Sequence, residues 1–371
     1  MHRALTPVRT VLGLLPLLLT LAFAQGQSPL AWRALYQGAV GGEPVTLDLA
    51  IADDGVAFAR LTLHATAETL DGAGRSDPDS GALELAFAPA TDAPPSVALD
   101  YAFLRSTAAA AEPAPDPELL LTGTRHLEWT DDGDELTVAL TRPGGRPAHG
   151  TLARSAQYVS VTLREGRIEA GYALPRFAAA PGLARRLETA ARERMTAFVA
   201  EGRALIDAGD GLGWGWTQHE ATDVMGAAGE YLSLLTSFYY YTGGAHPNSH
   251  AESLLVRVTR DGARAVPLAE LFAAGSGWLE RVGALVLEDL AAQEAAWVTN
   301  GDVSELSEAD LGVFTLGPTG LTFHFAPYAM GPYAQGPFRV TLPYAALTAL
   351  AAPDGPLPAF AGERGAADAQ R

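Results

Sequence analysis

From residue 32 to residue 140, apolar and polar side chains alternate with a period of two, the period that buries one face of a β-strand. The clearest run spans residues 45–51, where two leucines lie between a valine and an isoleucine on one face, and Asp54-Gly55 after it predicts a turn. The same alternation recurs at residues 83–87, 97–103 and 136–140. Short strands separated by turns predict an antiparallel β-domain over residues 25–150, folded as a small barrel or a sandwich.

The second half of the chain adds a helical period. Apolar residues lie three or four positions apart over residues 183–206 and 278–290, which predicts two amphipathic helices. Strands are predicted at residues 158–163, 231–241, 254–258, 313–316, 321–325 and 338–342. Because strands and helices come in blocks, we expect an α+β fold, in which the N-terminal antiparallel β-domain precedes an α+β module with a sheet and two amphipathic helices. Residues 352–371 are rich in Ala, Gly, Pro and charge, and predict a disordered tail.

The N-terminus has the pattern of a secretory signal peptide. Arg3 and Arg9 precede an apolar run over residues 11–23, and Ala22-Phe23-Ala24 supplies small residues at a cleavage site. An uncleaved anchor is the alternative, although the apolar run is short for a membrane span. Residues 1–24 are therefore predicted to be removed, which gives an exported protein, periplasmic or extracellular, without a stable membrane anchor.

Composition excludes several classes of site. The 371 residues contain no cysteine, so a disulfide, a thiol nucleophile and a zinc–thiolate centre are impossible. The 43 acidic and 25 basic residues give a formal net charge of -18, which argues against a nucleic-acid partner and against anionic membrane surfaces. No cofactor is expected.

The C-terminal half contains a set of short motifs in a characteristic order. They are YTGGAHPN at residues 241–248, PLAELF at 267–272, FHFAPY at 323–328, GPYAQG at 331–336 and VTLPY at 340–344. In sequence and spacing these motifs resemble the extracytoplasmic module shared by RsiV-type anti-sigma factors and PdaC-type peptidoglycan deacetylases. The resemblance implies a PdaC-like α+β subdomain over residues 151–240 and an RsiV-like C-terminal domain over residues 241–351.

This resemblance implies a binding role outside the membrane. RsiV-type proteins use the module to bind lysozyme, whereas PdaC-type enzymes carry it ahead of a separate deacetylase domain. In the present protein we expect neither a cytoplasmic sigma-binding segment nor a following deacetylase domain. We therefore expect a non-catalytic envelope protein that binds a cell-wall glycan or a wall-active protein such as lysozyme.

Candidate ligand-binding residues cluster in these motifs. Two adjacent glycines permit a sharp turn after an aromatic strand end, and tyrosine rings offer a stacking surface for a sugar or a protein. The predicted set is Tyr241, Gly243, Gly244, His246, Asn248, Tyr328 and Tyr333. The alternative is a packed turn, in which the histidine caps backbone groups and the tyrosine rings are buried.

Other chemistries have weaker patterns. His246 and His250 have the spacing of helical metal ligands, but Pro247 lies between them and opposes a helix. Residues 219–223 (HEATD) resemble a zinc-protease motif with Asp in place of the second His. Trp214 and Trp216, on a glycine-rich segment, suit either sugar stacking or core packing. A secreted hydrolase acting on wall material and a purely structural envelope protein remain the alternatives, and no catalytic or metal-binding residue is assigned.

Overall fold

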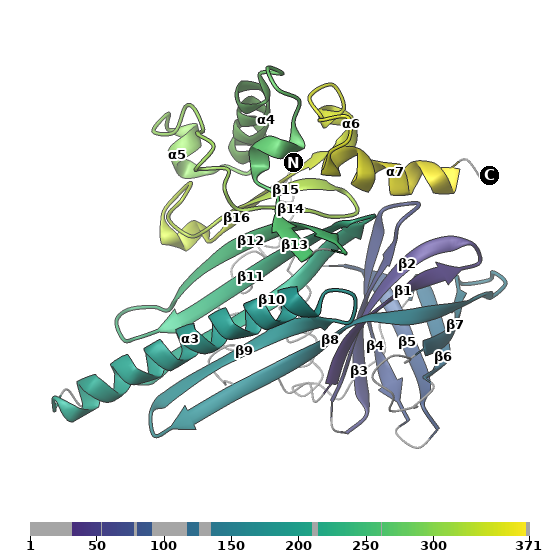
Figure 1. The fold of residues 1–371 in the computed structure, drawn as a ribbon, viewed down its shortest axis with the longest axis horizontal. Helices are drawn as coiled ribbons and strands as arrows, with labels where there is room; N and C mark the ends of the chain where they lie inside the picture. The colour runs from purple at the N-terminus through teal and green to yellow at the C-terminus, as the bar shows by residue number, and fades with distance from the viewer. Residues whose placement is uncertain are drawn as a thin grey trace, which may run out of the picture.

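The computed structural model describes residues 32–52, 54–77, 80–90, 117–125, 135–209, 214–260 and 262–368 (Figure 1). Two sheets account for most of this structure, one with 13 strands in the order β1 to β13 and one with three strands, β14-β15-β16. The fold is therefore mainly β. Helices lie against the sheets at the periphery (Figure 1).

The first eight strands close into an antiparallel barrel. They are β1 (Trp32–Val40), β2 (Glu43–Ile51), β3 (Val56–Leu63), β4 (Glu68–Ser76), β5 (Ala82–Pro89), β6 (Leu119–Arg125), β7 (Glu135–Thr141) and β8 (Ala148–Glu165). Each strand pairs with the next, and β1 also pairs with β8, which closes the ring. Of the barrel and the sandwich that the alternation allowed, the barrel forms.

The barrel interior is a packed apolar core. Leu47, Leu49 and Leu61 have no exposed surface, and Phe87 is also fully buried. The ring of Phe87 lies against Gly72, where a Cβ atom would overlap it. The period-two alternation of the sequence thus places its apolar face inside a closed sheet.

Strand β8 joins the barrel to the rest of the molecule. Its first half pairs with β7 and β1, and its second half pairs with β9 (Ile168–Phe177). The sheet continues through β10 (Trp216–Ala228), β11 (Tyr231–Tyr241), β12 (Asn248–Thr259) and β13 (Gly262–Ala265). Helix α3 (Pro181–Asp207) lies along one face of this extension and connects the parallel strands β9 and β10 (Figure 1).

The C-terminal part packs on the opposite side of the extension. Its elements are η1 (Leu268–Leu271), α4 (Trp278–Ala292), α5 (Ala296–Thr299), β14 (Phe314–Leu316), β15 (Gly320–Phe325), η2 (Tyr333–Gln335), β16 (Phe338–Pro343), α6 (Tyr344–Leu347) and α7 (Pro356–Asp368). Strand β14 lies over the sheet, where the Phe314 N–H donates to Ser253 Oγ at 2.8 Å and the Leu316 N–H donates to Ser233 Oγ at 2.9 Å. Within the described ranges, no helix combines the length and apolar character of a membrane-spanning segment.

Three expectations need correction. The α+β class is wrong, because one sheet runs from the barrel through the module and more residues lie in strands than in helices. The two predicted helices do form, as α3 and α4. The boundary at residue 150 falls inside β8. The tail is not disordered at its start, since α7 buries Leu357 and Phe360 in the C-terminal core. The strand predicted at residues 97–103 lies outside the described residues.

Candidate functional site

The loop between β11 and β12 forms the centre of the candidate site. Gly243 and Gly244 have φ angles of 99° and 100°, which side-chain-bearing residues rarely adopt. The indole ring of Trp214 occupies the space that a Cβ on Gly243 would need, and its Nε1–H donates to the carbonyl oxygen of Thr242 at 3.1 Å. The glycines thus allow the turn and the close approach of an indole that is 51% exposed.

His246 stacks on Tyr333 beyond this turn. The two ring centroids are 3.8 Å apart and the ring planes differ by 17°. The carbonyl oxygen of Pro247 lies 2.9 Å from His246 Nδ1 and accepts a hydrogen bond from the Tyr333 hydroxyl at 2.8 Å. Two segments more than 80 residues apart are thus held in one orientation.

Tyr328 extends this pair into a three-ring surface. Its ring centroid lies 5.5 Å from that of Tyr333 and 6.4 Å from that of His246. The Tyr328 side chain is 52% exposed, and its φ of 68° lies in the left-handed region that non-glycine residues seldom occupy. Strained backbone that presents an exposed aromatic ring is typical of a functional position. We call His246, Tyr328 and Tyr333 the aromatic platform.

Two tyrosines at this site have raised pKa values. Burial, and then the neighbouring Tyr328, raise the pKa of Tyr333 above its ordinary value. Tyr239, which is buried on β11, also has a raised pKa, because of burial and then of Tyr333 and Tyr241. The contacts of the His246 ring in the described structure are the Pro247 carbonyl and the two tyrosines. The arrangement therefore offers ring faces and hydroxyl groups to a ligand.

The remaining predicted residues lie beside the platform. The hydroxyl of Tyr241 donates to the carbonyl oxygen of Gly244 at 3.1 Å and braces the turn. Asn248 begins β12 opposite Tyr240, and its side chain has no hydrogen bond among the described residues. Trp216, in contrast, is a core residue, stacked on Phe198 at a centroid distance of 5.3 Å.

The metal and zinc-protease patterns do not form their geometry. His250 lies on a strand, and its ring stacks on Phe238 at a centroid distance of 4.5 Å, whereas the ring of His246 stacks on Tyr333. Residues 219–223 belong to β10, so the side chains of His219 and Glu220 point to opposite faces of the sheet. Within the described ranges, no group of three or more His, Asp and Glu side chains is arranged to hold a metal ion.

Sequence reasoning missed a partly buried ion pair on the face covered by α3, in which Glu220 is buried and Arg194 is 40% exposed. Arg194 donates two hydrogen bonds to Glu220, from Nε at 2.8 Å and from Nη2 at 2.5 Å, and its guanidinium lies over the ring of Phe238. The sequence gives no clear signal for this pair. Residues 216–228 form β10, but polar and apolar side chains do not alternate clearly along them. This pair holds α3 on the sheet and lies on the face opposite the C-terminal part.

Comparison with known proteins identifies one segment of the chain. A family described as "Protein of unknown function (DUF3298)" matches residues 269–345. No curated protein matches the sequence.

Two solved structures are similar to this chain. One is a DUF3298 family protein from Pseudomonas aeruginosa PAO1, with 16% identity, a TM-score of 0.37, and coverage of 53% of this chain and 93% of that chain. The other is a DUF3298 family member from Bacteroides fragilis NCTC 9343, with 16% identity, a TM-score of 0.35, and coverage of 57% and 98%. Residues 269–345, which include Tyr328 and Tyr333 but not His246, form a DUF3298 domain.

Proposed function

We propose that the protein is an exported, non-catalytic binding protein of the cell envelope, and that its aromatic platform binds a sugar ring of a cell-wall glycan. The observation that carries the proposal is the stack of His246 on Tyr333 with the exposed Tyr328 beside it. Such rings stack against apolar ligand faces, while their hydroxyl groups form hydrogen bonds at the rim.

The resemblance to the RsiV-type and PdaC-type extracytoplasmic module supports this class of ligand. The motifs that carry the resemblance include the residues that build the platform, His246 on one segment and Tyr328 and Tyr333 on another. The signal-peptide pattern at residues 1–24 supports export, which is necessary for a protein that meets wall material.

The test is co-sedimentation of the protein with purified peptidoglycan sacculi. Because Tyr328 is half exposed, its replacement by alanine removes a ring without opening the core, and we expect Tyr328→Ala to weaken binding about fivefold or more. Tyr333→Phe keeps the stacked ring and loses only the hydroxyl, so it should bind nearly as well as wild type.

Tyr240→Ala is the matched control. Tyr240 is a half-buried tyrosine of β11, and its ring faces His250 on the α3 side of the sheet. This variant should sediment like wild type. If wild type stays in the supernatant, the glycan proposal fails, and direct binding to lysozyme is then the test of a wall-active protein as the ligand.

A further inference from the structure

One edge of β12 lacks a neighbouring strand over half of its length. The short strand β13 pairs only with residues 256–259 of β12, and the N–H of Val266 adds a last hydrogen bond to the carbonyl oxygen of Leu255 at 2.8 Å. Pro267 then leads the chain away into η1. Residues 248–254 of β12 therefore do not pair with β13.

The backbone groups on this edge are those of alternate residues. In an antiparallel ladder the N–H and C=O of one residue point to the same side, and those of the next residue point to the other side. Since Leu255 faces β13, the groups of Ser249, Ala251 and Ser253 face the same way, away from β11. Among the described residues, none of these groups has a backbone partner on that side. The unpaired edge is roughly 20 Å long at the usual rise per residue.

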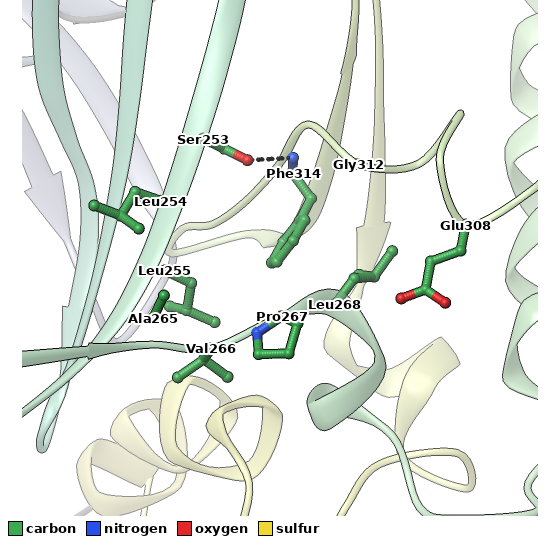
Figure 2. A pocket seen from close by; sticks show the side chains of 10 residues that line it. All are labelled: Ser253, Leu254, Leu255, Ala265, Val266, Pro267, Leu268, Glu308, Gly312 and Phe314. Carbon is green, nitrogen blue, oxygen red and sulfur yellow. Dashed lines mark hydrogen bonds between the residues drawn. The ribbon is translucent and has the colours of Figure 1, made fainter.

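An apolar pocket lies where this edge meets the C-terminal part. Its volume is about 340 Å³, and its lining residues are Ser253, Leu254, Leu255, Ala265, Val266, Pro267, Leu268, Glu308, Gly312 and Phe314. Figure 2 shows the side chains of Leu255, Val266, Leu268 and Phe314 gathered around it. Glu308 reaches towards Leu268 from the opposite loop, and among the described residues its carboxylate has no ion pair or hydrogen bond.

We propose that this edge of β12 binds an extended, basic peptide segment of a partner protein, which adds a strand beside residues 249–253 and inserts one aliphatic side chain into the pocket. Unpaired strand edges recruit such segments through main-chain hydrogen bonds, and pockets beside them select the side chains. This function is separate from glycan binding at the aromatic platform.

The sequence of this edge of β12 favours binding of an additional strand. Proteins commonly block exposed edges with proline, and residues 248–254 (NSHAESL) contain none. The unpaired carboxylate of Glu308 at the pocket, and the exposed Glu252 on the strand, select a basic partner. A second copy of the chain is disfavoured, since each copy has a formal net charge of -18 and brings the same carboxylates to the edge.

The test is fluorescence anisotropy with a labelled, end-capped heptapeptide that alternates arginine and valine. Ala251→Pro removes one outward N–H and leaves the ladder to β11 intact, so it should retain the thermal unfolding transition and weaken binding about tenfold or more. Ala251→Val keeps the N–H and should bind like wild type. In the wild-type complex, the amide protons of Ser249, Ala251 and Ser253 should exchange more slowly.

A second set of variants tests the pocket independently of Ala251. Glu308→Gln should weaken binding about threefold or more, whereas Glu305→Gln, an exposed carboxylate on the same loop that does not line the pocket, should have little effect. A peptide with alternate N-methylated amides should not bind.

The proposal is overturned by absence of saturable binding to wild type, by equal binding to Ala251→Pro, or by a dimer of the protein that this substitution dissociates. Tyr328→Ala should not change peptide affinity, which separates this proposal from the glycan proposal.

Discussion

Arg33 of the barrel donates a hydrogen bond to Asp223 of β10 at 2.8 Å, across 190 residues of sequence. The same guanidinium holds Asp48 with two hydrogen bonds, at 2.8 Å and 2.6 Å, and lies over the ring of Tyr158. All three charged side chains are buried. Burial by itself lowers the pKa of Arg33, but Asp48, Tyr158 and Asp223 outweigh it and raise that pKa well above the ordinary value. The barrel and the module are thus joined by a charge network that excludes solvent.

Removal of the Arg33 charge should destabilise the protein strongly. Arg33→Met keeps much of the side-chain volume but leaves two buried carboxylates without their cation, so we expect the free energy of unfolding to fall by about 3–5 kcal/mol. Urea denaturation measures this loss. Arg142→Met is the control, since Arg142 pairs with Glu68 on the surface, and its loss should cost less than about 1 kcal/mol. Equal effects of the two substitutions would contradict a special role for the buried network.

Gly243→Ala should displace the indole of Trp214. The new Cβ would overlap the ring, and the φ of 99° is unfavourable for alanine, so the loop must rearrange at a cost of about 1–3 kcal/mol. The indole N–H resonance of Trp214 reports the change, because that proton is hydrogen-bonded to Thr242 in the wild type. Gly244→Ala has a similar φ of 100° with no atom near the new Cβ, so it should cause strain and leave the indole resonance in place.

Because of His324, we expect the free energy of unfolding to fall in mild acid. Burial, and then Arg339, lower the pKa of His324 to about 3, while its Nε2 lies 2.8 Å from Thr315 Oγ1. Below the unfolded pKa of about 6.5 the unfolded chain binds a proton that the folded protein does not, so stability is lost as the pH falls. The loss should reach about 1–2 kcal/mol by pH 5.

His324→Gln should lack this contribution. Chemical denaturation of wild type and variant between pH 5 and pH 8 measures the difference. The free energies of unfolding should differ by a constant amount above pH 7, and their difference should change steadily below pH 6.5. Parallel profiles over the whole range would show that His324 titrates normally in the folded protein.

Phe360 should be necessary for the stability of the C-terminal core. Its ring is 6% exposed on α7 and lies close to Gly226 of β10. Phe360→Ala should reduce the free energy of unfolding by about 3–5 kcal/mol, since it leaves a cavity in that core. Pro358→Ala, an exposed position of the same helix, should change it by no more than about 0.5 kcal/mol. Thermal unfolding followed by circular dichroism compares the two variants.

Local pattern determined many elements of this protein. The alternation at residues 45–51, 83–87 and 136–140 predicted β2, β5 and β7, because the interior of a closed sheet selects every second side chain. The period of the two predicted helices located α3 and α4. The double glycine predicted a sharp turn, and the structure brings His246, Tyr328 and Tyr333 together around it. The binding role of these residues stays a prediction.

Only the tertiary structure decided how these elements are joined. Arg33 and Asp48 occupy polar positions of alternating strands, which predict a solvent-facing surface, yet both are buried where the barrel meets β10. Strand β8 continues from the barrel into the module, and this continuity makes the fold mainly β rather than α+β. The unpaired edge of β12 likewise depends on where β13 ends. Period and composition report the local environment of a residue, whereas strand partners and buried charge pairs depend on contacts between residues far apart in the sequence.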